Sequence, residues 1–223
     1  LWFGSGAWIR FGAQCEGACD RKGEDVLELG GEVKGVGKDE GKGVEAWERE
    51  ASEGVGEFGF FRVRRDHVRS PRTGERFERH VLEVPDWVNV VPVTTDGRIV
   101  LVEQYRFGSE EVTLEFPAGI IDPGEDACTA GVRELEEETG YRAASCEHLA
   151  ELHANPAMQD NSVHIVVAHG CTPTGTFAQD AGEDIRVRVA TVEEVERWIT
   201  EGRIRHALAV VAWLVKQRNV DRG

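Results

Sequence analysis

Three acidic residues in one short segment are spaced to act together on a metal ion. Glu134, Glu137 and Glu138 lie in the run GIIDPGEDACTAGVRELEEETGY, which covers residues 119–141. On a helix, residues four apart lie about 5–6 Å from each other, so Glu134 and Glu138 share a face and Glu137 lies beside them. Carboxylates this close repel each other unless a positive charge lies between them. A hard divalent cation, which prefers oxygen ligands, meets that requirement.

The residues around the glutamates favour a metal site over a solvated charged face, which is the commoner reason for a run of glutamates. Residues 122–124 (DPG) predict a turn, because proline fixes φ and glycine accepts unusual backbone angles. A helix is then expected from Asp126 to Gly140, since glycine commonly ends a helix. Arg133 can orient neighbouring carboxylates with its planar fork of donors. Glu125 is expected to brace the loop or to join the outer shell of the metal.

The full set of fixed positions resembles the signature of the Nudix hydrolases. The matching residues are Gly119, Glu125, Arg133, Glu134, Glu137, Glu138 and Gly140. Beyond this signature, the segments RVRRD, PDWVNVVPVT, LVEQYR, LEFPAG and EDIRV are similar to the ADP-ribose pyrophosphatase branch of that family. The resemblance covers residues 57–218 and implies an enzyme that hydrolyses phosphorus anhydrides.

The same resemblance implies which residues hold the metal and the substrate. Mg²⁺, with Mn²⁺ as the alternative, is expected to bind the carbonyl of Ala118 and the carboxylates of Glu134 and Glu138. Glu137 is expected to ligate or bridge a second ion. For the substrate, the resemblance implies contacts from Arg106, in EQYR, and from Glu115, just before PAG.

Catalysis requires a carboxylate that takes the proton of the attacking water. In the family a mobile loop before the last strand often supplies this base, which here corresponds to residues 177–184 (FAQDAGED). Glu183 is the first choice, and Asp180 and Glu137 are the alternatives. Arg133 and Glu137 complete the expected catalytic set with Glu183.

The leading substrate is a nucleoside diphosphate sugar, most directly ADP-ribose, which would be split into AMP and ribose 5-phosphate. The segment HANPAMQDNSVH departs from the proline-glycine signature of many ADP-ribose hydrolases, and its Asn155, Pro156 and Asn161 resemble a less characterised subgroup. GDP-mannose or another nucleotide sugar therefore remains an alternative. A further alternative is a Nudix domain that senses a ligand without hydrolysing it.

Composition limits the possible partners. The chain of 223 residues has a formal net charge of −15, which argues against a nucleic-acid partner because phosphate backbones require a basic surface. No apolar run approaches the roughly 18–20 residues needed to span a membrane. Five cysteines, an odd number without a regular framework, suggest reduced thiols in a cytoplasmic compartment.

The expected architecture is α/β, a Nudix-type α/β/α sandwich with a mixed sheet, preceded by an N-terminal β-hairpin segment. Residues 1–56 are glycine-rich and weakly periodic, so we expect a poorly packed or disordered extension there. Residues 57–223 form the Nudix domain, with N-terminal strands at 57–85 and the core at 86–223. The last helix is expected at 204–217, with an apolar stripe of Ala207, Val210, Val211 and Leu214. The family resemblance also implies a homodimer with intertwined N-terminal strands.

Overall fold

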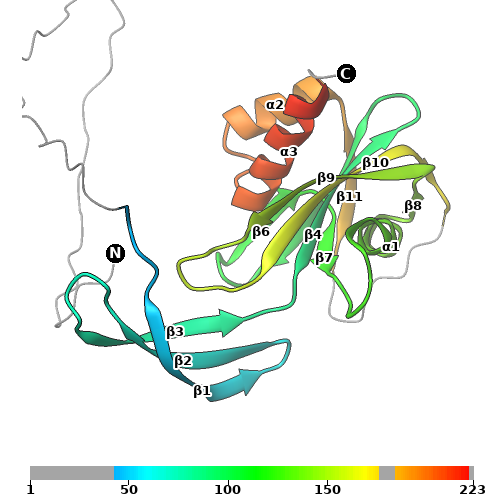
Figure 1. Ribbon diagram of the computed structural model, residues 1–223. Coiled ribbons are helices and arrows are strands. Elements are labelled where there is room, and N and C mark those ends of the chain that lie inside the picture. The colour runs from blue at the N-terminus through cyan, green and yellow to red at the C-terminus, as the bar shows by residue number, and fades with distance from the viewer. Residues whose placement is uncertain (1–42, 176–183, 221–223) are drawn as a thin grey trace, which may run out of the picture. The chain divides into compact units, whose positions relative to one another are not determined.

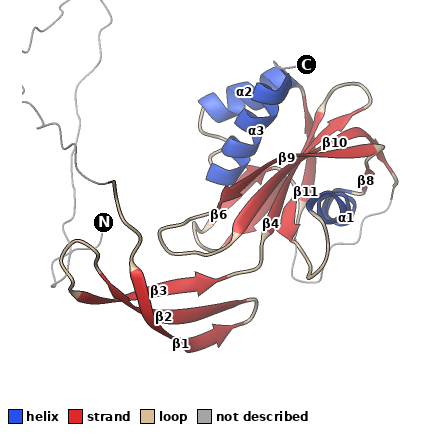
Figure 2. Cartoon of the chain, in the orientation of Figure 1, coloured by secondary structure: helices blue, strands red, loops and turns tan. Residues whose placement is uncertain are grey.

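The structure is a computed structural model and describes residues 43–175 and 184–220. All helices and strands described below lie within one unit of the chain, residues 45–223. The elements, shown in Figure 1 and by type in Figure 2, are β1 (Glu48–Phe58), β2 (Phe61–Arg69), β3 (Arg76–Glu83), β4 (Trp87–Thr94), β5 (Ile99–Arg106), β6 (Glu111–Glu115), β7 (Ala118–Ile120), α1 (Ala127–Thr139), β8 (Tyr141–Arg142), β9 (Ser145–His153), β10 (Ser162–Pro173), β11 (Arg186–Ala190), α2 (Val192–Thr200) and α3 (Ala207–Val220). Within the described ranges, no helix is both long enough and apolar enough to cross a membrane.

The larger sheet has a mixed topology because its central strands β4 and β10 run parallel, whereas the other pairs are antiparallel. The strand order is β11-β5-β4-β10-β8, with β6 beside β5, β7 beside β4 and β9 beside β10. Alternate residues of a strand point to opposite faces. The core reflects this, since Val91 and Ile165 belong to one buried cluster and Val90 and Val166 to the other.

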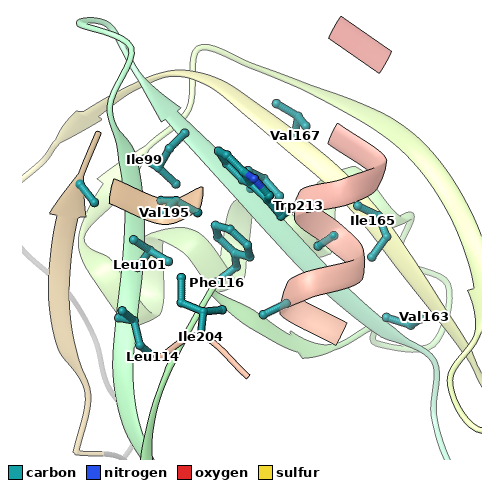
Figure 3. Packing of buried hydrophobic residues seen from close by; sticks show 14 residues of the cluster. Ile99, Leu101, Leu114, Phe116, Val163, Ile165, Val167, Val195, Ile204 and Trp213 are labelled. Atoms are coloured by element: carbon teal, nitrogen blue, oxygen red, sulfur yellow. The ribbon is translucent and has the colours of Figure 1, made fainter. Parts of the chain in front are cut away.

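Helices cover both faces of this sheet, as Figure 1 shows. Helix α1 packs against one face through Ala130 and Leu135, while α2 and α3 pack against the other. The α/β/α sandwich expected from the sequence is confirmed. In the cluster under α3, the rings of Phe116 and Trp213 stack with their centroids 6.0 Å apart (Figure 3).

Helix α3 differs from the prediction in its start and in its buried side. It begins at Ala207 rather than at residue 204, and its buried residues are Ala209, Ala212 and Trp213. Leu214, placed in the apolar stripe by the sequence, is 54% exposed. The whole helix is rich in apolar residues, so the 3.6-residue period alone does not reveal which side faces the sheet.

The smaller sheet has the order β1-β2-β3 and includes a strand that the sequence did not indicate. The ordered domain was expected to begin at residue 57, whereas β1 begins at Glu48. Most of β1 is exposed, and its pairing with β2 is supported by ion pairs such as Glu53–Arg65 at 2.6 Å. A strand held in this way lacks the apolar alternation by which a strand is recognised in a sequence. Residues 1–42 lie outside the described part of the chain, so the expectation for them stays a prediction.

Helix α1 begins and ends as predicted. The Asp126 side chain caps its start, accepting from the backbone N–H groups of Cys128 and Thr129 at 3.0 and 3.1 Å. At its end, Gly140 has a φ of 65°, in the left-handed region, and its N–H donates to the carbonyl of Glu136. The backbone that carries the carboxylates of α1 is therefore fixed at both ends of the helix.

We expect Asp126→Ala to lower the thermal stability of the protein, because the first turn of α1 then loses its side-chain acceptor. Loss of such a cap should reduce Tm by about 2–4 °C in a domain of this size. Differential scanning calorimetry measures this shift, and Asp126→Asn, which keeps a capping oxygen, is the control. An Asp126→Ala protein with an unchanged Tm would contradict the proposed capping role.

Candidate active site

The guanidinium of Arg133 lies among the carboxylates of α1 and of the loop before it. Its Nη1 donates to Glu134 Oε1 at 2.7 Å and to Glu137 Oε2 at 3.2 Å. Its Nε and Nη2 donate to the two oxygens of Glu125 at 3.1 and 2.9 Å, and Nη2 also donates to the carbonyl of Ile120. The hydrogen bond to Glu125 is the main reason that the pKa of Arg133 is raised. Arg133 thus links the loop to the helix, and Glu125 braces the loop as predicted.

Strand β7 brings the predicted carbonyl ligand beside two of the carboxylates. Glu138 is 4% exposed, and its Oε2 accepts the N–H of Ala118 at 3.2 Å. Ala118 is the first residue of β7 and pairs with Asn89 of β4. A Cβ atom added at Gly119 would run into the carboxylate of Glu134. Glycine at this position therefore lets the Glu134 side chain lie directly against β7.

The chemistry of these donors fits a hard divalent cation, because carboxylate and carbonyl oxygens are the ligands that Mg²⁺ prefers. Within residues 43–175 and 184–220, no three His, Cys, Asp or Glu side chains are arranged to hold one metal ion together. Instead, a single nitrogen of Arg133 contacts both Glu134 and Glu137. The metal roles of Ala118, Glu134, Glu137 and Glu138 therefore stay predictions.

We expect Gly119→Ala to reduce turnover without unfolding the protein. The added methyl group displaces only the end of the flexible Glu134 side chain, which moves at little cost to folding. A displacement of about 1 Å in a catalytic constellation can cost about a hundredfold in rate. Steady-state kinetics measures the loss, and Gly54→Ala is the matched control, since a Cβ atom at Gly54 meets nothing within 4 Å. Equal rates for the two variants would show that this close approach is irrelevant.

A second charged group lies near β7, since Arg106 and the three residues of β7 line one cavity. The Nε and Nη2 atoms of Arg106 donate to the two oxygens of Glu115 at 2.8 and 2.9 Å. The Glu115 carboxylate also accepts from the Thr113 hydroxyl, and the Nδ1 of His206 lies 3.2 Å from its Oε2. Burial alone would raise the pKa of Glu115, but the hydrogen bonds from Arg106 and Thr113 and the charges of Arg106 and His206 outweigh it. The pKa of Glu115 is therefore lowered, and the group stays ionised.

The predicted contact between Glu115 and the substrate does not fit this geometry. Glu115 has no exposed surface, because Arg106 and Thr113 cover its carboxylate. The Glu115 carboxylate instead holds the Arg106 guanidinium in position through the two hydrogen bonds. A sequence places Glu115 close to the active-site loop but does not reveal that its neighbours enclose it.

Arg106 and His206 line two cavities. The smaller has a volume of about 310 Å³ and borders β7, with Trp87, Asn89 and Leu208 among its other walls. The larger has a volume of about 1030 Å³ and extends along residues 104–109 at the end of β5. The predicted substrate residue Arg106 is thus placed where a bound molecule could reach both cavities.

The remaining predicted residue, Glu183, and its alternative Asp180 lie outside the described part of the chain. The cavity walls add Asn89 and His206, which the sequence reading did not select. A signal for Asn89 was present, since it is the one polar residue in the apolar stretch WVNVV. His206 gives no comparable signal, because it lies among arginines in RIRHA and resembles an ordinary surface residue.

The unusual segment HANPAMQDNSVH joins the two sheets and does not line either cavity. Asp160 receives hydrogen bonds from Arg64 at 2.9 Å and from the N–H of Val84 at 3.2 Å. The Asn161 side chain is buried and donates to the carbonyl of Pro85 at 3.1 Å. These contacts give the segment a structural role, and its departure from other sequences does not by itself exclude ADP-ribose.

The fold agrees with the comparisons with known proteins. The family model of the NUDIX domain matches residues 84–211, which is more than half of the chain. The chain therefore belongs to the Nudix family. A solved structure of an ADP compounds hydrolase has the same fold, with a TM-score of 0.72 and 24% identity, and the match covers 81% of this chain and 97% of that one.

Curated relatives place the chain within the family, in the branch similar to ADP-ribose pyrophosphatases. The ADP-ribose pyrophosphatase of Mycobacterium tuberculosis is 32% identical over 156 residues, which cover 69% of this chain and 75% of that protein. The methanol dehydrogenase activator of Bacillus methanolicus is 35% identical over 148 residues, covering 66% and 80% respectively. The ADP-ribose pyrophosphatase of Bacillus subtilis is 29% identical over 140 residues, covering 62% and 76%. The prediction of a Nudix pyrophosphohydrolase is confirmed by these relatives.

Proposed function

We propose that this protein hydrolyses the diphosphate bond of a nucleoside diphosphate sugar with the help of Mg²⁺, and that ADP-ribose is its leading substrate. The products would be AMP and ribose 5-phosphate. One observation carries the proposal: the acidic helix α1 and the cavity lined by Arg106 both border the short strand β7. Relatives named ADP-ribose pyrophosphatase support the choice of substrate.

The residues divide the work between charge and orientation. Ala118, Glu134 and Glu138, with Glu137 for a second ion, would hold Mg²⁺, which supplies charge neutralisation of the diphosphate and a more acidic water. Arg133 keeps two of these carboxylates in place through hydrogen bonds to Glu134 and Glu137.

In the cavity beside β7, Arg106 would bind a phosphate oxygen or the adjoining sugar. Its guanidinium is preoriented by the bidentate contact with Glu115, so little conformational freedom is lost when the substrate binds. Proton transfer from the attacking water is assigned to Glu183, with Asp180 and Glu137 as alternatives. Positioning and electrostatics supply much of the rate in reactions at phosphorus, which agrees with a site composed of fixed charges.

The substrate is tested with a panel of ADP-ribose, GDP-mannose, UDP-glucose, dinucleoside polyphosphates and nucleoside triphosphates, each with Mg²⁺ and with EDTA. We expect ADP-ribose to have the highest kcat/KM and to yield AMP and ribose 5-phosphate only with the metal. A preference for GDP-mannose would contradict ADP-ribose as the substrate but leave the proposed hydrolysis of a diphosphate bond unchanged. Binding of ADP-ribose without turnover of any compound would favour a ligand-sensing domain and contradict hydrolysis.

We also propose that the protein forms a homodimer through its N-terminal strands. Several large apolar side chains on or near these strands are exposed, among them Val55, Phe58 and Phe60 at 54%, 55% and 60%. Apolar surface of this kind is typical of protein interfaces. Light scattering coupled to size exclusion gives the mass in solution, and a mass of 24.7 kDa would contradict a dimer.

A cytoplasmic location is proposed from the cysteines. Cys128, Cys146 and Cys171 are free thiols in the described part of the chain, as expected for a reducing compartment. Fractionation of cells that express the protein, with detection by a specific antibody, tests the location.

A second candidate function follows from the relative named methanol dehydrogenase activator. We propose that hydrolysis by this protein could serve to activate a dehydrogenase of that kind. Adding the protein to a purified methanol dehydrogenase and measuring alcohol oxidation tests the candidate. An unchanged rate would leave nucleotide sugar hydrolysis as the sole proposed function.

A further inference from the structure

Asn89 is a buried polar residue whose side-chain donor has no hydrogen-bond partner in the described part of the chain. It is 2% exposed, and its Nδ2 atom has no hydrogen-bond partner among the described residues. Burying an amide donor without a partner costs on the order of 1–3 kcal/mol. An apolar residue would avoid that cost in a strand whose neighbours Val88, Val90 and Val91 are all apolar. Because the described residues offer no acceptor, the asparagine at this position points to a bound ligand as its partner.

The position of Asn89 shows where that partner would bind. Asn89 lines the cavity of about 310 Å³, together with Trp87, Leu208 and the three residues of β7. It pairs through its backbone with Ala118, the predicted carbonyl ligand of the metal. A group that accepts a hydrogen bond from Asn89 would therefore lie beside β4, and the carboxylates of α1 contact the neighbouring strand β7.

The walls of this cavity combine charged, polar and apolar side chains. Arg106 forms a bidentate pair with Glu115, and His206 lies beside the same carboxylate. The walls also include the apolar surfaces of Trp87 and Leu208. A sugar ring, with hydroxyl groups on its edge and C–H groups on its faces, matches this mixture of polar donors and apolar walls.

The larger cavity suits the nucleobase, which leaves the smaller one for the second sugar. Three aromatic side chains lie in the walls of the larger cavity, Phe60, Tyr105 and Phe107. Tyr105 and Phe107 are 47% and 84% exposed, and their ring centroids are 5.3 Å apart. Exposed aromatic rings are favourable stacking surfaces for bases. A nucleoside diphosphate sugar carries its base and its terminal sugar on opposite sides of the diphosphate. If the base occupies the larger cavity, the terminal sugar falls beside β7.

We propose that the cavity formed by Trp87, Asn89, β7 and Leu208 is the subsite for the terminal sugar, and that the Asn89 amide donates a hydrogen bond to one of its hydroxyl groups. This inference rests on the proposed function. It assigns to Asn89 the discrimination between substrates that carry a second sugar and nucleotides that lack one. His206 lines the same cavity and has its Nδ1 directed at Glu115, so its other ring nitrogen is a second possible contact for the sugar.

The test compares binding of ADP-ribose and ADP, because ADP has the adenosine diphosphate part and lacks the terminal sugar. Titration calorimetry without metal separates binding from turnover. We expect Asn89→Leu, which is similar in size, to weaken ADP-ribose binding by about 3- to 10-fold, the value of one neutral hydrogen bond, and to leave ADP binding unchanged. Asn89→Ser, a smaller polar residue, should weaken ADP-ribose binding in the same way and serves if the leucine variant does not fold.

Asn161 provides the matched control. It is also a buried asparagine, but its Nδ2 donates to the carbonyl of Pro85 and it lines neither cavity. Asn161→Ser should lower Tm and leave the affinity for ADP-ribose unchanged.

The outcomes separate this inference from the proposed function. Unchanged ADP-ribose affinity in both Asn89 variants, or an equal loss for ADP and ADP-ribose, overturns the terminal-sugar subsite while hydrolysis by the wild type still stands. A wild-type protein that neither binds ADP-ribose nor hydrolyses it overturns the proposed function and this subsite with it.

Discussion

Glu138→Gln is expected to reduce Mg²⁺-dependent hydrolysis of ADP-ribose by at least about a hundredfold. Glutamine keeps the size of the side chain and an oxygen that can accept the Ala118 N–H, but it removes the negative charge beside the expected metal. Metal ions contribute several kcal/mol to charge stabilisation, and each 1.4 kcal/mol corresponds to about tenfold in rate. Steady-state kinetics across a range of Mg²⁺ concentrations measures the effect, which should appear as a loss of both rate and metal affinity.

The same substitution two residues earlier is the control. Glu136 lies on the same helix, but its carboxylate binds Arg142, with the Arg142 Nη2 at 2.5 Å, rather than the Arg133 cluster. Glu136→Gln should keep nearly wild-type activity. If Glu138→Gln and Glu136→Gln were equally active, the acidic face of α1 would have no role in catalysis.

Arg106→Met is expected to have the largest effect on stability. The variant removes the bidentate partner of Glu115, which is fully buried. Breaking a buried ion pair usually costs about 3–5 kcal/mol, because the remaining charge is left without a partner. Arg106 is itself 37% exposed and His206 can compensate in part, so we expect a lower value of about 2–3 kcal/mol in the free energy of unfolding. Urea denaturation measures this change.

The pH dependence gives a further check on the same pair. In the wild type the pKa of Glu115 is lowered below its ordinary value of 4.5. The stability that the ionised Glu115 contributes is therefore fully present above pH 4.5 and is lost as the pH falls through the lowered pKa. In Arg106→Met the pKa of Glu115 should rise, because burial then dominates. The difference in unfolding free energy between wild type and variant should therefore shrink between pH 7 and pH 4.

The double variant Arg106→Met/Glu115→Leu shows whether the cost comes from the orphaned charge. Replacing both partners of a buried pair with apolar residues is often neutral or stabilising. We expect the double variant to regain most of the stability lost in Arg106→Met and to bind ADP-ribose weakly. Wild-type stability in Arg106→Met alone would contradict the role of this pair in fixing Glu115.

The acidic helix and its loop could be predicted from the sequence because their information is local. The turn at residues 122–124, the cap at Asp126 and the glycine at Gly140 each follow from the preferences of single residues over a few positions. The ion pair between Arg133 and Glu137, four residues apart, follows from helical spacing. All of these features are present in the structure.

The cavity could not be predicted in the same way, because its walls come from distant parts of the chain. Asn89 and His206 meet only after β4 and the start of α3 pack on the same face of the sheet. The burial of Glu115 depends on Arg106 from the neighbouring strand β5. Neither the pairing of these side chains nor their exposure can be obtained from the spacing of residues along one segment.

Binding of Mn²⁺ measured by electron paramagnetic resonance tests the metal site most directly. The signal of free Mn²⁺ falls when the ion binds to protein, and this requires neither substrate nor turnover. We expect the wild type to remove Mn²⁺ from solution, and Glu136→Gln to do the same. Glu138→Gln should leave most of the ion free at equal concentration. Equal binding by wild type and Glu138→Gln would contradict the central claim that the carboxylates of α1 hold the divalent cation.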